Sequence, residues 1–278
     1  MSSTVNKTTI GHVGIYVTEH CPLRCRDCNA GVPYNKHPCH YSVDELSTWI
    51  EKTFELIGWV EHVDFIGGEP LVHPEMTVLC KELHKYKNKF SEMRILTSST
   101  VMPSDKLLEY IRTIIDNGFK FLFYLDNYGE ELSKCFGKIK DKLNDYNIPY
   151  RITDYSGKTP AYGGWVDYRM YDLPEHKGYD AGQLSEVFSQ CFYYKSGGSL
   201  VLRNGSVYPC VFPLTREILG QRKAPPEEKI DLCDDTVSVE QKKALALSFR
   251  ERKTPYKACE FCPGLWEGAP RVPPAVQL

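Results

Sequence analysis

Three cysteines lie close together near the start of the sequence, at Cys21, Cys25 and Cys28. Their C-x3-C-x2-C spacing lets one short loop offer three thiolates, which can hold three irons of a [4Fe–4S] cube. The fourth iron then keeps an open coordination position, as a catalytic metal requires. A structural zinc knuckle is the alternative that this spacing leaves open.

A glycine-rich motif, Gly67-Gly68-Glu69-Pro70, follows the apolar strand predicted at Val63–Ile66. Glycines let a ligand approach the backbone closely, and the Glu69 carboxylate can accept hydrogen bonds from an ammonium group. The cysteine loop in turn follows a strand predicted at His12–Thr18. Both motifs therefore come at the carboxyl ends of strands, where α/β folds place their active sites, and this favours the catalytic cluster over zinc.

Taken together, these two motifs resemble those of the radical S-adenosylmethionine (SAM) superfamily. The resemblance implies that the amino and carboxylate groups of SAM chelate the open iron. The sequence departs from the usual pattern of the superfamily at Asp27, before the third cysteine, where an aromatic residue is common. The predicted cofactor-binding residues are Gly67, Gly68, Glu69, Pro70, Thr97, Ser98, Ser99 and Asp126, which follow successive predicted strands.

A second group of cysteines lies toward the C-terminus, at Cys191, Cys210, Cys259 and Cys262. A hairpin predicted around residues 199–210 resembles the hairpin of SPASM and twitch domains in radical SAM enzymes. Four cysteines match the shorter twitch domain, as in the radical SAM dehydrogenase of aminocyclitol (2-deoxy-scyllo-inosamine) metabolism, and imply a second, fully ligated [4Fe–4S] cluster. A zinc site is again the alternative, and Cys39 and Cys233 stay open as further ligands.

The elements that must position these motifs alternate between strand and helix up to about residue 155, which predicts a parallel sheet with helices outside it. The resemblance specifies this as a partial (β/α)6 TIM-like barrel over residues 1–180, followed by a small twitch domain over 181–278. The predicted strands are His12–Thr18, Val63–Ile66, Met93–Leu96, Phe119–Leu125, Tyr150–Thr153 and Trp165–Leu173. Asn204-Gly205 predicts the turn of the hairpin, 239–250 a helix, and 156–164 a turn-rich stretch.

Polar residues near the ends of the late strands are the candidates for handling substrate. Dehydrogenation of an alcohol needs a group that takes the hydroxyl proton, and loops after strands commonly carry such groups. We predict Arg151, Asp154, Tyr155 and Arg169 as catalytic residues.

Composition excludes several classes of protein. The chain has 278 residues, 34 Lys and Arg, 36 Asp and Glu and a formal charge of −2, so nucleic acid is not expected as a partner. Its aromatic content of 12% excludes general disorder. No apolar run is long enough to span a bilayer, and no signal peptide is evident, so we expect a cytoplasmic protein without a membrane partner. In that compartment, eleven cysteines indicate metal ligation more than disulfides.

The function predicted from the sequence is that of a radical SAM oxidoreductase with two [4Fe–4S] clusters and SAM. Its substrate would be a small polar molecule such as an aminocyclitol or sugar-like alcohol, and its electrons would come from a donor such as flavodoxin or ferredoxin. A peptide-modifying radical SAM enzyme is the alternative, although a first strand near residue 12 leaves no room for a leader-binding domain before it. A non-catalytic zinc-binding protein is the second alternative.

Overall fold

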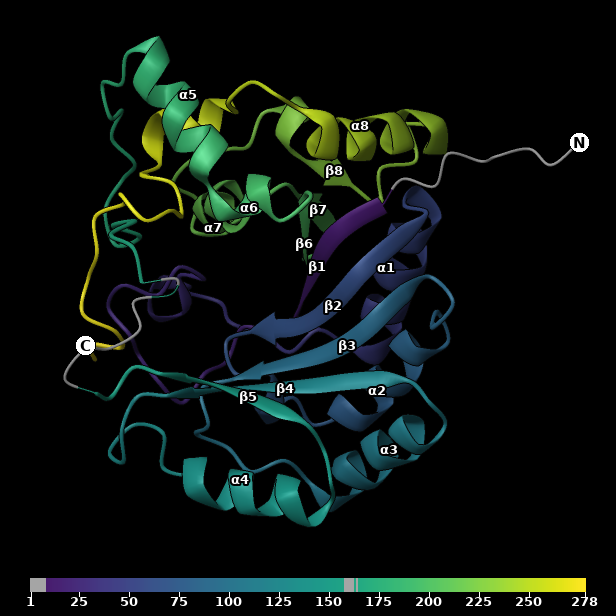
Figure 1. Cartoon of the computed structure of the whole chain (residues 1–278). Helices are drawn as coiled ribbons and strands as arrows, with labels where there is room; N and C mark the ends of the chain where they lie inside the picture. The colour runs from purple at the N-terminus through teal and green to yellow at the C-terminus, as the bar shows by residue number, and fades with distance from the viewer. Residues whose placement is uncertain (1–8, 158–162, 164) are drawn as a thin grey trace, which may run out of the picture.

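The computed structural model describes residues 9–157, 163 and 165–278. Its centre is one open eight-stranded sheet with the order β5-β4-β3-β2-β1-β6-β7-β8 (Figure 1). This mixed α/β arrangement confirms the predicted partial TIM-like barrel. The strands are β1 (Thr9–Thr18), β2 (Trp59–Gly67), β3 (Phe90–Thr97), β4 (Lys120–Asn127), β5 (Tyr150–Asp154), β6 (Ser199–Arg203), β7 (Ser206–Tyr208) and β8 (Ile230–Asp231).

Strands β1 to β5 are parallel, and a helix connects each to the next. These helices lie together along one side of the sheet in Figure 1. The first begins at a capping box, in which Ser42 and Glu45 satisfy each other's backbone N–H groups. The connecting helices are α1 (Val43–Leu56), α2 (Met76–His84), α3 (Asp105–Asp116) and α4 (Phe136–Asp145).

The strand predicted at Trp165–Leu173 is wrong. This segment makes an isolated bridge between Val166 and Arg271, and its backbone groups are used elsewhere. The Arg216 guanidinium donates to the carbonyls of Tyr168 and Asp172, each at 2.6 Å, and the Asp172 N–H donates to the Arg169 carbonyl in a turn. A segment whose carbonyls are occupied in this way cannot form a ladder with β5.

On the other side of β1 from β2, strand β6 pairs with β1 in parallel. The predicted hairpin follows, because Asn204 and Gly205 have φ values of 49° and 70°, as a two-residue turn of the favoured twist requires. Strands β7 and β8 then extend the same sheet antiparallel. The C-terminal helices gather at this end of the sheet in Figure 1 and are α5 (Ala181–Gln190), α6 (Phe192–Lys195), α7 (Val211–Ile218) and α8 (Val239–Glu251).

Short 3-10 turns complete the elements and lie at Val32–Tyr34, Pro70–Val72, Pro226–Glu228 and Lys257–Phe261. The core between sheet and connecting helices consists of fully buried side chains such as Phe65, Ile95, Leu108 and Phe123. Among the described residues, none of the helices has the length and apolarity needed to cross a bilayer. Most of the turn-rich stretch predicted at 156–164 lies outside the described residues.

Candidate functional site

A cavity of about 760 Å³ lies against the inward-facing side chains of β1 to β4. Its wall includes all three cysteines of the N-terminal triplet together with Gly67 and Gly68. The strands are parallel, so their carboxyl ends bring these two motifs to one edge of the sheet although about forty residues separate them. The sequence-predicted motifs therefore share one cavity.

The thiols of the triplet lie in surroundings that disfavour their charged forms. Burial raises the pKa of Cys21 to about 12 and that of Cys25 to about 11, and it also raises the pKa of Cys28. Proximity of the other two thiols adds to the shift of Cys21. Thiolates are stable in such surroundings when a metal binds them, so this donor set fits an iron–sulfur cluster held by three cysteines.

A buried ion pair ties the cysteine loop to the C-terminal hairpin. Arg203 on β6 is 1% exposed, and its Nε lies 2.8 Å from Glu19 Oε1, just beyond the end of β1. The Tyr41 hydroxyl donates to the same oxygen at 2.6 Å. Arg203 Nη1 also donates to the carbonyl of Ala30, two residues after the third cysteine, at 3.1 Å. The loop that would carry the cluster is thus positioned by a residue 173 places away.

The last residues of the chain pair with the cysteine loop as well. The Arg26 N–H donates to the Val276 carbonyl at 2.7 Å, and the Leu278 N–H donates to the Arg24 carbonyl at 3.0 Å. Between them, Gln277 Nε2 donates to Cys25 Sγ at 3.2 Å. Hydrogen bonds to ligand sulfurs help to set the reduction potential of iron–sulfur clusters. Gln277 would therefore influence a cluster on this loop in addition to holding the loop in place.

Gly67 and Gly68 are required by close chain packing. A Cβ on Gly67 would lie 2.3 Å from the Thr18 carbonyl oxygen, and one on Gly68 would lie 2.1 Å from that of His20. Gly67 also has a φ of 151°, which side chains disfavour. The glycines therefore let β2 meet the start of the cysteine loop, and both also line the cavity.

Glu69 is fully buried, and both of its oxygens are held by the protein. Oε2 accepts from the Ser98 N–H at 2.8 Å and from the Ser98 hydroxyl at 2.6 Å, while Oε1 accepts from the Leu71 N–H at 3.1 Å. Pro70 begins the 3-10 turn that supplies this last donor. Burial raises the pKa of Glu69, and these hydrogen bonds oppose that shift. The carboxylate joins the carboxyl ends of β2 and β3.

The predicted residues after β3 and β4 lie around the same edge. Thr97 and Ser98 line the cavity with Asp126. Ser99 is buried with a φ of 59°, and the Thr97 hydroxyl accepts from its N–H at 3.1 Å. Burial raises the pKa of Asp126 to about 7, against a hydrogen bond from the Tyr128 hydroxyl at 3.2 Å. Asp126 can therefore exchange a proton near neutral pH.

The four predicted catalytic residues do not converge. Tyr155 lines the cavity and stacks on Tyr128 with ring centroids 5.0 Å apart. Asp154 is exposed and accepts from the Ser156 hydroxyl at 2.6 Å. Arg151 is exposed at the edge strand, and the exposed Arg169 pairs with Asp172 at 3.2 Å. Of this set, the structure brings Tyr155 alone into the cavity wall.

The four C-terminal cysteines surround a second, small and apolar cavity. Burial raises the pKa of Cys259 to about 12 and raises those of Cys210 and Cys262 well above the usual range, with the neighbouring thiols adding to each. The Leu265 N–H approaches Cys191 Sγ at 3.5 Å, and the Gly264 N–H donates to Cys262 Sγ at 3.3 Å. This donor set fits a fully ligated cluster or a zinc ion. Cys39 and Cys233 are exposed and line neither cavity.

Sequence analysis missed a polar group deeper in the large cavity. His12, His62, Asp64, Arg94 and Tyr124 line it from β1 to β4. Alternate residues of a strand face the same side, so the polar residues at the alternate positions 62 and 64 were the available signal.

Residues 15–149, which include the cysteine triplet and the glycine-rich motif, match the family model of the Radical SAM superfamily. The match covers slightly less than half of the chain and contains both motifs of the large cavity. Curated relatives match over 40–49% of the chain. GTP 3′,8-cyclase of Campylobacter jejuni subsp. doylei is 28% identical over 138 residues, which are 49% of this chain and 40% of that protein. GTP 3′,8-cyclase of Peptoclostridium acidaminophilum is 30% identical over 113 residues, or 40% and 32%. The chain thus spans less than half the length of these relatives.

Solved structures resemble almost the whole chain in fold. BtrN in complex with AdoMet and 2-DOIA has a TM-score of 0.58 at 15% identity, covering 91% of each chain. The protein anSMEcpe with bound AdoMet and Cp18Cys peptide has a TM-score of 0.53 at 14% identity, covering 95% of this chain and 92% of that one. The similarity in fold to these structures therefore reaches beyond residues 15–149.

Proposed function

We propose that this protein is a radical SAM oxidoreductase that oxidises a small polar alcohol, such as an aminocyclitol or sugar, with the help of an auxiliary [4Fe–4S] cluster. The observation that carries the proposal is the arrangement of the two cysteine sites. Tyr193 and Val211 line both the large cavity and the small four-cysteine cavity, so a single layer of side chains separates them. A substrate radical in the large cavity would lie within reach of an electron acceptor.

The chain's own residues divide into two functional groups under this proposal. When bound, the cluster of Cys21, Cys25 and Cys28 and its SAM supply a deoxyadenosyl radical that removes hydrogen from an unactivated C–H bond. Gly67, Gly68 and the Glu69–Ser98 pair shape the pocket for the methionine part of SAM. The apolar wall around Cys191, Cys210, Cys259 and Cys262 keeps water from the second cluster.

Support for the substrate class comes from the polar side chains among the residues that line the cavity and from the shared fold with BtrN, which was solved with 2-DOIA. Within the cavity, Asp126 can hold a proton near pH 7, and Tyr155 offers an aromatic face and a hydroxyl. A cavity of about 760 Å³ has room for SAM and a small substrate together. We propose a small reducing protein such as flavodoxin or ferredoxin as the electron donor.

The alternative that a specific observation favours is a peptide substrate, because the anSMEcpe structure with a bound peptide shares the fold. Anaerobic incubation with reductant, SAM and candidate substrates separates the two. A small polyol should raise the yield of 5′-deoxyadenosine and should transfer deuterium from a labelled carbon into it. A peptide that does so in place of every polyol would contradict the proposed substrate class.

The metal content tests the proposal without a substrate. Two cubane clusters predict about eight irons and eight sulfides per reconstituted chain. Replacement of Cys21, Cys25 and Cys28 by Ala should halve this content and abolish reductive cleavage of SAM, while Cys39→Ala, at an exposed thiol, should change neither. Zinc in place of iron in the triplet would overturn the assignment.

A further inference from the structure

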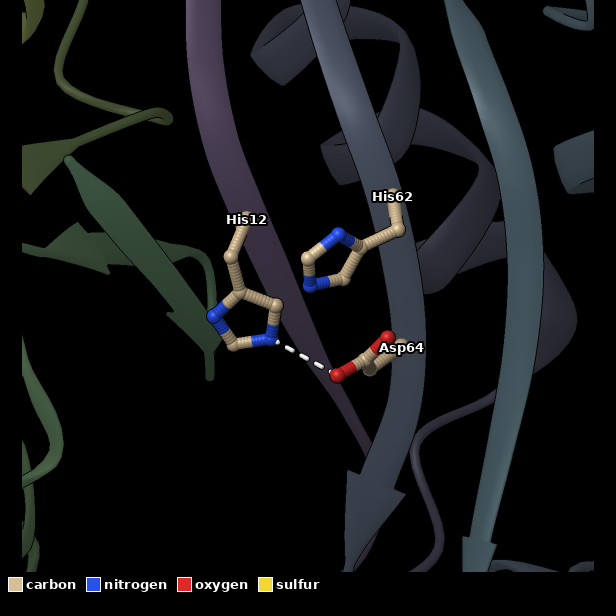
Figure 2. Close-up of side chains that lie close together, drawn as sticks. All are labelled: His12, His62 and Asp64. Carbon is tan, nitrogen blue, oxygen red and sulfur yellow. Dashed lines mark ion pairs between the residues drawn. The ribbon is translucent and has the colours of Figure 1, made fainter. Parts of the chain in front are cut away.

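Three potential metal ligands face one another in the large cavity, away from the cysteine loop. Figure 2 shows the rings of His12 on β1 and of His62 on β2 pointing toward each other and toward the Asp64 carboxylate on β2. One ligand atom from each lies within 4.8 Å of the others. The parallel register places His12 beside His62 and Gly14 beside Asp64, so adjacent strands bring the three side chains together.

Polar atoms in this cluster have unused bonding capacity. His12 Nε2 lies 2.9 Å from Asp64 Oδ2, yet this nitrogen makes no hydrogen bond of acceptable geometry with the described residues. Asp64 Oδ1 is also buried and likewise lacks a hydrogen-bond partner among them. Buried polar atoms left without partners are costly, so their clustering indicates a ligand that satisfies them together.

The surroundings fit a cation. His12 Nδ1 lies 2.9 Å from the hydroxyl of the buried Ser199 on β6, so a hydrogen bond can fix the ring and leave the Nε2 lone pair for a metal. Arg94 on β3 is the nearby positive charge, and it is paired with Glu92. All three ligands line the cavity, which gives an ion a path of entry.

We propose that His12, His62 and Asp64 bind one divalent transition-metal ion of the zinc type. Two imidazoles and one carboxylate suit such ions, and three protein ligands leave a coordination position open toward the cavity. The site is distinct from the cluster on the cysteine loop, because Asp64 lies three residues before Gly67, the end of β2 that meets the start of the loop, a separation of roughly 10 Å along the strand. It is a third inorganic site and does not depend on the proposed function.

Zinc uptake by the cluster-loaded protein tests this site. The whole chain, reconstituted with iron and sulfide under anaerobic conditions, is dialysed against increasing Zn²⁺ and its metals are counted. Wild type should take up one zinc per chain that Asp64→Asn and His62→Ala bind at least tenfold more weakly. Ser199→Ala, which removes the support of the His12 ring, should weaken binding by about 10- to 100-fold. Glu61→Gln changes a neighbouring carboxylate of the same cavity and should bind zinc as wild type does.

Iron and sulfide content and the melting temperature show that each variant is folded and loaded. If Asp64→Asn fails that check, Ser199→Ala supplies the decisive comparison, since it loses one hydroxyl and no ligand. Equal zinc binding by wild type and by every folded variant would mean that zinc sits elsewhere and that His12 and Asp64 form an ion pair only. No zinc uptake by wild type would overturn the proposal as well. SAM cleavage is measured separately, so either proposal can fail alone.

Discussion

Individual acidic side chains hold the edge of the cavity where the two motifs meet. Glu69 joins β2 to β3 through Ser98, and Asp126 lies at the end of the next strand. Burial raises the pKa of both, and the charge of Glu69 adds to the shift of Asp126. A cationic ligand group, such as the ammonium of SAM, would favour the charged forms of both carboxyl groups and lower their pKa values.

Replacement of Asp126 by Asn should change how stability depends on pH. The carboxyl has a pKa of about 7 in the folded chain and about 3.8 when unperturbed, so the folded state holds the proton more tightly. Stability is therefore lost as pH rises from about 4 to about 7. Asp126→Asn removes this loss. Since the Asp126 side chain is partly accessible from the cavity, we expect the variant to be about 1–2 kcal/mol more stable than wild type at pH 8.

Thermal melting of both proteins without SAM, at pH 5 and at pH 8, measures this effect. The advantage of the variant should be larger at pH 8. An advantage that is equal at the two values would show that Asp126 titrates normally.

Replacement of Glu69 by Ala should weaken SAM binding by about tenfold or more at unchanged iron content, because a charge-assisted hydrogen bond contributes about 1.5–3 kcal/mol. The matched control is Ser98→Ala, which keeps the Ser98 N–H donor and removes only the hydroxyl. It should weaken binding less. Calorimetric titration with SAM makes the comparison, and wild-type affinity in Glu69→Ala would rule out a role in binding.

At the scale of elements, the cysteine loop depends on strands and tails far from it in sequence. Arg203 on β6 reaches Glu19 and Ala30, and the Thr215 hydroxyl on α7 donates to the Asn29 carbonyl at 2.9 Å. The residues around Gln277 pair with the loop from its other side. The C-terminal half of the chain therefore shapes the N-terminal metal site.

Substitution of Arg203 by Met should destabilise the chain by about 3–5 kcal/mol, since it leaves the buried Glu19 charge without its partner. The cysteine loop should loosen with it, and the iron content of the N-terminal cluster should fall. The double variant with Glu19→Gln removes the unpaired charge and should recover much of the stability. Melting temperature and iron analysis report the two effects. Wild-type stability in the single variant would show that the pair contributes little.

At the scale of the whole molecule, two cysteine sites meet across one layer of side chains. Cys259 and Cys262 come from one 3-10 turn and its end, whereas Cys191 follows α5 and Cys210 follows β7. A metal group bound by all four would therefore tie together elements that are far apart in sequence, and its loss should affect stability as well as electron transfer.

Replacement of both Cys259 and Cys262 by Ala should remove about half of the iron and lower the melting temperature. The N-terminal site should still cleave SAM to 5′-deoxyadenosine, while oxidised product is lost because the substrate radical lacks its electron acceptor. Cys233→Ala, at an exposed thiol, serves as the control and should keep both activities. Full product formation by a folded variant without the second cluster would contradict the acceptor role.

The sequence by itself determined the local elements and the motifs. The helix expected at 239–250 and the Asn204-Gly205 turn form as predicted, because each depends on side chains and backbone within a few residues. The same holds for the alternation of strands and helices up to β5. Residues 15–149, which carry the triplet and the glycine-rich motif, match the superfamily model because spacing along a short loop is a property of the sequence itself.

Tertiary structure alone decided which distant segments meet. A strand was predicted at 165–173, but the Arg216 guanidinium binds carbonyls of this segment, and β6, far along the chain, pairs with β1. The same pairing brings Ser199 to His12 and Arg203 to the cysteine loop. Local patterns set the conformation of each segment, whereas strand register and buried polar contacts across the chain set its neighbours. The His12–His62–Asp64 cluster depends on the pairing of β1 with β2, and for that reason the sequence alone did not predict it.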